Sequence, residues 1–272
     1  MSSPPSSKSC SRTDTWPATQ WHSFFNAWVF FSRLPQPPGI RFNDHLLNHS
    51  SRYFTWVGAI LGLLLAGVLV LGDLLWNAPL AVALMLAASL LLTGAFHEDG
   101  LADLFDGFGG GFSREAVLSI MKDSRLGTYG AAALVVTLLV RWLAWTTLFE
   151  QGLSVWWALP FIAAWSRFWA ISTLWTLPYA RDHDQDQDSK SKPLATRFGL
   201  AATGVALVPL LGLIGWLTPG SVLGLTLAAL TLRIVLNRWF MRRIQGYTGD
   251  CLGGAQQLQE TLALLVLLGL IT

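Results

Sequence analysis

The stretch YFTWVGAILGLLLAGVLVL, residues 53–71, decides the fold, because it is long, apolar and free of charged side chains. A helix needs about 20 mostly apolar residues to cross the hydrocarbon core of a bilayer. The apolar side chains follow one another without alternating with polar ones, which favours a helix over the strand of a membrane barrel. The stretch therefore predicts a transmembrane helix.

Further stretches repeat this pattern along the chain. They are Ala78–Phe96, Gly130–Phe149, Leu153–Leu177, Gly199–Leu217 and Ser221–Leu236. A last one, Leu258–Thr272, is short for a full crossing, so it either ends in the membrane or crosses it at a tilt. We therefore expect an all-α fold, a polytopic integral membrane helical bundle with about six to seven transmembrane helices.

The composition supports a membrane protein. Of the 272 residues, 53% are hydrophobic and only 12% are charged, whereas an ordinary soluble domain carries roughly 25% charged residues. This excludes a soluble globule and a disordered chain, and two cysteines are too few for a secreted disulfide scaffold. Fourteen tryptophans suit a protein that is anchored at two membrane–water interfaces.

Lys and Arg residues are distributed unevenly among the predicted loops. Arg141, Arg167 and Arg233 lie inside predicted spans, and the loops after the first, third and fifth spans carry no cation. The others precede the first span or follow the second, fourth and sixth: Lys8, Arg12, Arg33, Arg41, Arg52, Arg114, Lys122, Arg125, Arg181, Lys190, Lys192, Arg197, Arg238, Arg242 and Arg243. Since cytoplasmic loops carry the excess of Lys and Arg, the N-terminus is predicted to be cytoplasmic.

The start of the chain differs in composition from the rest. Residues 1–20 are rich in Ser and Pro, which predicts a disordered polar N-terminal tail, and residues 21–272 are expected to form a single membrane-embedded domain. Within that domain, Trp21–Phe31 is short, apolar and aromatic, and no small-residue cleavage site follows it. An interfacial or re-entrant helix therefore fits better than a signal-peptide core.

An acidic segment follows the second predicted span. It reads HEDGLADLFDG over residues 97–107, and Asp99, Asp103 and Asp106 stand at i, i+4 and i+7. On a helix these carboxylates fall within one narrow arc, where they repel each other unless a cation lies between them. Oxygen ligands suit Mg²⁺ better than zinc, so the segment predicts a magnesium site. The alternative is a solvated acidic end of a helix without a functional role.

The next segment offers cations close to these carboxylates. Ser113 predicts the N-cap of a short helix, and after that helix Lys122 and Arg125 offer positive charge, with Asp123 as a further metal ligand. Such cations beside a metal suit phosphoryl transfer, which needs charge neutralised around phosphate oxygens. In the alternative interpretation, the two cations only anchor the loop on the cytoplasmic side and the Gly-rich stretch 107–111 is a hinge.

A second polar cluster, GYTGDCLGG over residues 246–254, is predicted on the same side of the membrane. It makes Asp250 a candidate metal ligand or general base, and the alternative is a helix cap before the final span. Aspartates also alternate through residues 182–188, but no apolar scaffold fixes them, so they predict a solvated loop.

The three arginines inside predicted spans are functional candidates, because intramembrane charges usually face the protein interior. Arg167 lies nearest the middle of its span and is the best candidate to bind an anion. Arg141 and Arg233 either snorkel to the interface or have structural partners.

These motifs resemble those of the cobalamin synthase family, the adenosylcobinamide-GDP ribazoletransferases. The similarity lies in FHEDGLADLFDG (96–107), IMKDSRLGTYG (120–130), SRLP (32–35), SRYFTWVG (51–58) and GYTGDCLGGA (246–255). The matches run in order along most of the chain, and their combination is specific although each alone is not. The sequence departs from the family pattern at Glu98, where leucine is usual, and over Gln256–Glu260.

The resemblance implies a reaction. The ribose hydroxyl of α-ribazole, or of its 5′-phosphate, would attack the corrinoid-side phosphorus of adenosylcobinamide-GDP, and GMP would leave. Adenosylcobalamin or its 5′-phosphate would result, which is the final nucleotide-loop assembly step of cobalamin biosynthesis. The expected roles are Mg²⁺ binding by Asp99, Asp103, Asp106 and Asp123, phosphate binding by Lys122, Arg125 and Arg167, and proton acceptance by Asp250 or His97.

The resemblance also implies a location and partners. We expect a multi-pass protein of the bacterial cytoplasmic (inner) membrane with its active site facing the cytoplasm. The expected partners are the two substrates and the lipid bilayer, with no nucleic acid. Two kinds of assembly stay open, a homo-oligomer and an association with other cobalamin-assembly enzymes.

Two other classes of protein use similar residues. A membrane phosphotransferase of the CDP-alcohol type also holds metal with helix aspartates, but Ala-Arg usually follows its Asp-Gly, and here Leu101-Ala102-Asp103 follows Asp99-Gly100. A cation transporter would want polar groups at the membrane midplane, often in repeated halves, whereas these carboxylates cluster at one face without a repeat. Metal uptake into proteoliposomes without corrinoid chemistry would favour the transporter.

Overall fold

The computed structural model describes residues 16–180 and 198–271, and within them it contains helices and no β-strand. The helices are α1 (Trp16–Phe31), α2 (Asp44–Ser50), η1 (Ser51–Tyr53), α3 (Phe54–Leu75), α4 (Ala78–Thr93), α5 (Phe96–Gly110), α6 (Arg114–Ile120), α7 (Thr128–Glu150), α8 (Val155–Ile171), η2 (Ser172–Trp175), α9 (Leu200–Leu213), η4 (Ile214–Trp216), α10 (Pro219–Ile244) and α11 (Gly249–Ile271). The all-α fold is therefore confirmed.

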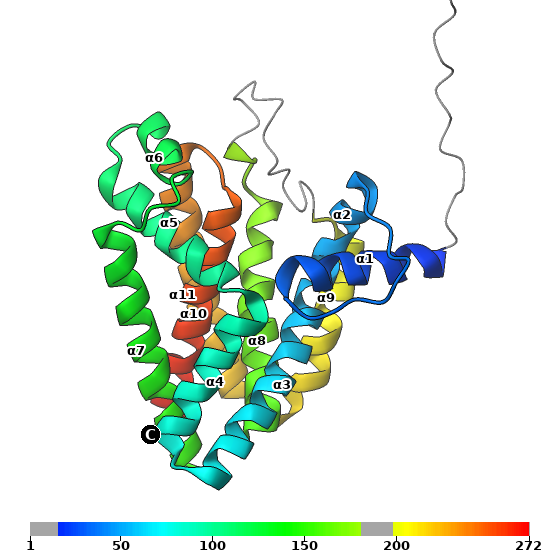
Figure 1. The fold of residues 1–272 in the computed structure, drawn as a ribbon, viewed down its shortest axis with the longest axis vertical. Helices are drawn as coiled ribbons and strands as arrows, with labels where there is room; N and C mark the ends of the chain where they lie inside the picture. The colour runs from blue at the N-terminus through cyan, green and yellow to red at the C-terminus, as the bar shows by residue number, and fades with distance from the viewer. Residues whose placement is uncertain (1–15, 181–197, 272) are drawn as a thin grey trace, which may run out of the picture.

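The long helices stand side by side, and α1 lies across them (Figure 1). This arrangement fits the interfacial helix predicted for Trp21–Phe31. The helix begins at Trp16, so it takes in the last residues of the stretch that was expected to be a disordered tail.

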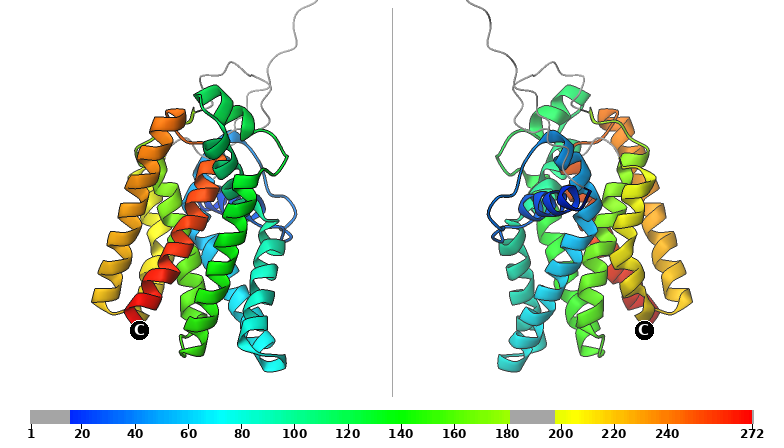
Figure 2. Two further views of the ribbon diagram at one scale, coloured as in Figure 1. Left: turned by 90° about the vertical axis from the view of Figure 1, so that its left-hand side faces the viewer. Right: turned by 90° about the vertical axis from the view of Figure 1, so that its right-hand side faces the viewer.

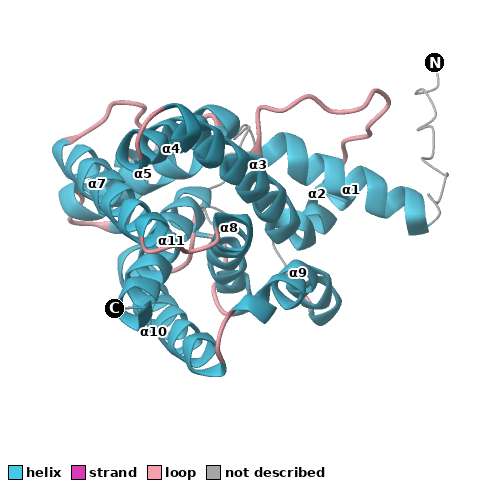
Figure 3. Cartoon of the chain, turned by 90° about the horizontal axis from the view of Figure 1, so that it is seen from below, coloured by secondary structure: helices cyan, strands magenta, loops and turns pink. Residues whose placement is uncertain are grey.

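Helix α8 is the centre of the bundle, and α3, α9 and α11 surround it (Figure 3). Nearly all of its side chains are buried. Helix α3 approaches it closely because Gly58 and Gly62 have no side chain. A Cβ atom at either glycine would lie 2.6 Å from a carbonyl oxygen of α8, that of Ala163 or Leu159 respectively. Such close packing is how helices associate in a membrane, where the hydrophobic effect between them is weak.

The second predicted span differs from the structure. Instead of one helix over Ala78–Phe96, the chain bends by 88° between α4 and α5. Gly94 and Ala95 both adopt left-handed backbone conformations, with φ of 66° and 55°, and the Ala95 N–H donates to the carbonyl of Leu90. A left-handed residue after a helix is a common stop signal, and here it starts a new helix in another direction. The apolar residues Ala95 and Phe96 follow Gly94, so the apolar run extends past the break and hydropathy places the end of the span a few residues too late.

By length and composition, three helical segments are able to cross a membrane: His45–Leu75, Thr128–Glu150 and Pro219–Ile244. The bent pair α4 and α5 would make a fourth. The final helix α11 begins at Gly249, well before the predicted Leu258, and is therefore long enough for a crossing. The number of six to seven transmembrane helices stays a prediction.

The two ends of the bundle are different. Helix α6 and the turn between α10 and α11 lie at one end, and the C-terminus lies at the other (Figure 2). The cationic segment between α6 and α7 and the cationic last turns of α10 lie at the α6 end, as the alternation of the spans predicts, and the loop after α1 lies beside α1, further from that end (Figure 1). Because the predicted site residues also follow these spans, the fold places their segments at one end of the molecule.

Candidate functional site

The acidic segment forms helix α5, which begins directly after the 88° bend. Its three aspartates differ in exposure, since Asp99 is exposed, Asp103 is half-buried and Asp106 is buried. The three aspartates lie on one helix, as their spacing predicts. Their side chains become progressively more buried from Asp99 to Asp106.

Helix α11 packs against α5 between the first two aspartates. A Cβ atom at Gly100 would lie 3.0 Å from the carbonyl oxygen of Asp250 and 3.1 Å from the Cα atom of Gly253. Only glycine at position 100 allows this backbone approach, which brings Asp250 next to the turn that carries Asp99 and Asp103. We call Asp99, Asp103 and Asp250 the acidic face.

The start of α11 is fixed from two sides. Thr248 caps the helix, because its hydroxyl accepts a hydrogen bond from the Cys251 N–H at 3.3 Å and donates one to Asp250 at 3.2 Å. Asp250 is therefore not the cap itself, and the first turn of a helix is a favourable place for its negative charge. The preceding residue, Tyr247, pairs with the segment after α8 through hydrogen bonds with Pro178 and Ala180 at 3.0 and 2.9 Å.

Asp106 has a structural partner. Its carboxylate accepts hydrogen bonds from the N–H groups of Gly127 at 2.7 Å and Gly130 at 2.9 Å. These donors belong to the first turn of α7, so Asp106 caps that helix from a neighbouring one. We therefore leave Asp106 out of the metal site.

The capping role leads to a prediction for Asp106→Ala. Removing the carboxylate leaves the buried N–H group of Gly130 and the half-buried N–H group of Gly127 without this acceptor, and we expect a loss of about 2 kcal/mol in the free energy of unfolding. Thermal unfolding of the purified protein in detergent measures the change. Ser113→Ala, which removes the exposed cap of α6, is the matched control with a smaller expected loss. An Asp106→Ala protein as stable as the wild type would contradict the capping role.

The loop between α6 and α7 pairs two of its own charges. Asp123 and Arg125 form an exposed ion pair at 2.5 Å, with a second hydrogen bond of 3.0 Å from Nε of Arg125. These hydrogen bonds hold the pKa of the Asp123 carboxyl below its ordinary value. The predicted ligand and the predicted phosphate-binding group thus neutralise each other in this structure. Lys122 is exposed on the same turn.

The structure does not assemble the four-carboxylate metal site predicted from the sequence. Within residues 16–180 and 198–271, no group of three or more His, Cys, Asp or Glu side chains is placed to hold a metal ion. The carboxylates of the acidic face still suit Mg²⁺, because this ion usually takes one or two protein carboxylates and completes its shell with water and substrate phosphates. The Asp-rich stretch 182–188 lies outside the described residues.

His97 and Arg167 lie inside the bundle. The His97 ring is buried and stacks on Phe31 and Phe54, with interplanar angles of 15° and 12°. The Arg167 guanidinium is also buried, donates to the Ala163 carbonyl of its own helix at 2.9 Å and lies 5.6 Å from the centre of the Phe54 ring. This burial argues against direct contact of either group with a polar substrate at the end of the bundle.

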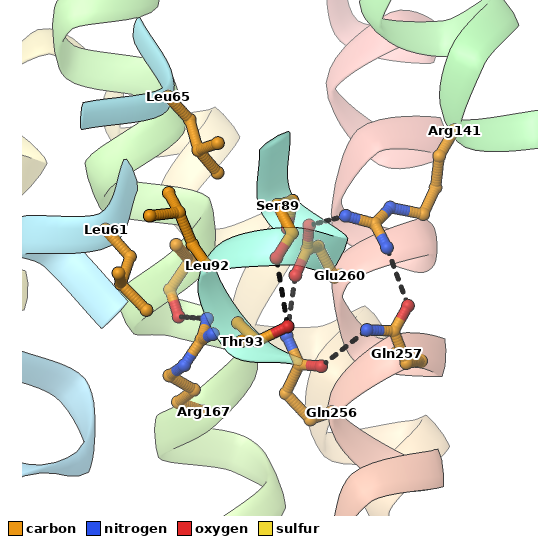
Figure 4. Close-up of a pocket in the computed structure, with 11 residues that line it drawn as sticks. Leu61, Leu65, Ser89, Leu92, Thr93, Arg141, Arg167, Gln256, Gln257 and Glu260 are labelled. Atoms are coloured by element: carbon orange, nitrogen blue, oxygen red, sulfur yellow. Dashed lines mark hydrogen bonds and ion pairs between the residues drawn. The ribbon is translucent and has the colours of Figure 1, made fainter. Parts of the chain in front are cut away.

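The sequence reasoning missed a buried network that joins α5, α7 and α11. Arg141 donates to Gln257 at 2.6 Å and forms an ion pair with Glu260 (Figure 4). It also lies 3.7 Å from Glu98. Gln257 in turn donates to Glu98 at 2.9 Å. Of the two alternatives left open for Arg141, the structure shows the one with structural partners. Glu98 and Gln257 both belong to segments in which the sequence departs from the family pattern, and here they are in contact.

The network continues toward α8. Gln256 donates to Ser166 at 2.9 Å and to Glu260 at 2.6 Å. Gln256 and Glu260 line a cavity of about 20 Å³, which is enough for one water molecule. Because Glu98 directly precedes Asp99, the network fixes the first turn of α5 and hence the position of the acidic face.

Two arginines join the loops at this end of the bundle. Arg114 donates to the carbonyls of Ala180 at 2.5 Å and Ile244 at 3.2 Å, and Arg243 donates to the carbonyl of Phe108 at 2.8 Å. They satisfy carbonyls at the ends of α5 and α10, where positive charge is favourable. These two cations therefore have structural roles.

The fold and the site together define the class of this protein. It is an all-α membrane protein with an acidic face at one end of its helical bundle. Residues 23–268 match the model of the family described as cobalamin-5-phosphate synthase, and the chain belongs to that family. This agrees with the resemblance drawn from the motifs.

Curated relatives match over nearly the whole chain. A protein of Vibrio parahaemolyticus is 42% identical over 251 residues, 92% of each chain, and one of Vibrio cholerae is 44% identical over 255 residues. The latter match covers 92% of this chain and 94% of the relative. A protein of Shewanella pealeana is 45% identical over 258 residues, 92% of this chain and 95% of the relative. Each is named adenosylcobinamide-GDP ribazoletransferase. No solved structure matches the chain.

Proposed function

We propose that this chain is a membrane transferase that joins adenosylcobinamide-GDP to α-ribazole or its 5′-phosphate. The products are adenosylcobalamin, or its 5′-phosphate, and GMP, so the reaction is the final step of nucleotide-loop assembly. The observation that carries the proposal is the match to ribazoletransferases at 42–45% identity over about 92% of the chain.

The acidic face supports this chemistry. In the reaction, a ribose hydroxyl attacks the corrinoid-side phosphorus of a pyrophosphate, the bond from that phosphorus to the oxygen of GMP breaks, and the hydroxyl proton needs an acceptor. Asp250 is the proposed acceptor, because it is half-buried beside the other two aspartates in the first turn of α11. Lys122, exposed at the same end of the bundle, is the proposed partner of the phosphate oxygens.

The proposed cofactor is Mg²⁺, held by Asp99 and Asp103. Both are carboxylates one helical turn apart, and oxygen ligands of this kind are those that Mg²⁺ prefers. When bound, the ion neutralises charge on the pyrophosphate oxygens. The proposed location is the bacterial inner membrane with the acidic face toward the cytoplasm, because the described cationic loops lie at that end.

The proposal is tested with purified protein in detergent or liposomes. We expect GMP and the corrinoid product to form together from adenosylcobinamide-GDP and α-ribazole, and we expect EDTA to stop the reaction until Mg²⁺ is added back. Chromatography follows both products. Folded protein that forms neither product, with and without lipid, would contradict the proposed function, and full activity in EDTA would contradict the proposed cofactor alone.

A further inference from the structure

We propose that a groove along the last turns of α10 binds an anionic phospholipid. The groove has a volume of about 470 Å³ and lies between α10 and the segment that follows η2. The residues that line it include three arginines and three apolar residues, namely Arg233, Arg238, Arg242, Leu177, Ile234 and Met241. No carboxylate is among the described residues that line it.

The cations of the groove are open to a ligand. Arg238 and Arg242 are exposed, stand one helical turn apart and make no hydrogen bond or ion pair with the residues that the structure describes. Arg233 precedes Arg242 by nine residues on the same helix. At a rise of 1.5 Å per residue, the two residues are about 14 Å apart along the helix axis. One of the nitrogens of Arg233 donates to the Ser172 carbonyl at 2.9 Å and the Thr176 hydroxyl at 3.1 Å, and its buried Nε has no partner in the described part of the chain.

The apolar part of the groove identifies the ligand as a lipid. Ile234 and Met241 are 39% and 41% exposed, so apolar surface lies beside the guanidinium groups. Helix α10 is long and apolar enough to cross a membrane, and its arginines lie at the end of the bundle where the cationic loops gather. The phosphate of an anionic lipid would bind to the arginines, and its acyl chain would pack on the apolar side chains. Basic pockets between membrane helices bind anionic headgroups in the same way.

The groove is separate from the acidic face. On the other side of α10, Trp239 contacts Phe108 of α5 with ring centres 4.7 Å apart, and Arg243 donates to the carbonyl of Phe108. The groove therefore faces away from α5, and the proposal is independent of the proposed reaction.

The test is a titration of the full chain in detergent, with native mass spectrometry to count bound lipid. The three probes are phosphatidylglycerol, phosphatidylcholine and inorganic phosphate. We expect phosphatidylglycerol to bind at least tenfold more tightly than phosphatidylcholine, and the double variant R238Q/R242Q to lose about tenfold in affinity for it. R125Q, which removes an exposed cation from a distant loop, is the matched control and is expected to bind as the wild type does.

Three outcomes would overturn the proposal. They are equal affinity for the two lipids, unchanged binding by the folded double variant, and displacement of the lipid by millimolar phosphate, which would indicate a phosphate site instead. If R238Q/R242Q fails to fold, R238K/R242K provides the test, because it keeps the charge and must keep the preference for phosphatidylglycerol.

Discussion

Replacing Asp103 with Asn should lower the rate of corrinoid product formation by about a thousandfold while the protein stays folded. The substitution keeps the size of the side chain and removes its negative charge, so it would weaken the proposed metal ligand without disturbing the helix. Asp103 is half-buried on α5, one turn from Asp99 and beside the start of α11. GMP release and product formation in detergent measure the rate, and thermal unfolding confirms the fold.

Glu115→Gln is the matched control for this experiment. Glu115 is an exposed carboxylate in the first turn of α6, at the same end of the bundle, and it belongs to neither the acidic face nor the buried network. We expect its variant to turn over at the wild-type rate, which separates a specific role of Asp103 from a general loss of negative charge. An Asp103→Asn protein with normal turnover would remove Asp103 from the site, and Asp99→Asn would then test whether α5 binds a metal at all.

The sequence predicts the features of this molecule that depend on local patterns. Continuous apolar runs predict the helices of the bundle, the alternation of cationic loops predicts one cationic end, and Ser113 is the cap of α6 as expected. Each of these features depends on residues close together in the chain, so hydropathy, charge and capping preference are enough to find them.

The remaining features depend on contacts between distant segments. The spacing of Asp106 predicts its place on a helix, but only the fold shows that its carboxylate meets the amides of α7. Arg141 and Glu260 are likewise separated by more than a hundred residues along the chain, and no local pattern pairs them. The bend at Gly94 occurs two residues before the end of the apolar run, and hydropathy gives no sign of the left-handed backbone that turns the chain there.

Replacing Arg141 with Met should be the most destabilising single change in the bundle. Arg141 is buried, with Glu260 as its ion-pair partner and Glu98 nearby. Removing one partner of a buried ion pair leaves an uncompensated charge, which costs about 3–5 kcal/mol. The first turn of α5 also loses the contact of Glu98 with Arg141, so turnover should fall together with stability. Thermal unfolding in detergent measures the stability.

The triple variant R141M/E98Q/E260Q tests whether unpaired charge causes this loss. A buried charge network that is replaced by neutral side chains of similar size is often as stable as the original, because no ion remains to be desolvated. We therefore expect the triple variant to recover most of the stability that Arg141→Met loses. Arg125→Met, which removes an exposed arginine, should have little effect, because exposed ion pairs contribute little. If Arg141→Met unfolds at the wild-type temperature, the network does not hold α5 in place. If the triple variant is as unstable as the single one, the loss comes from the removed hydrogen bonds and packing, and the guanidinium stabilises the bundle through its geometry more than through its charge.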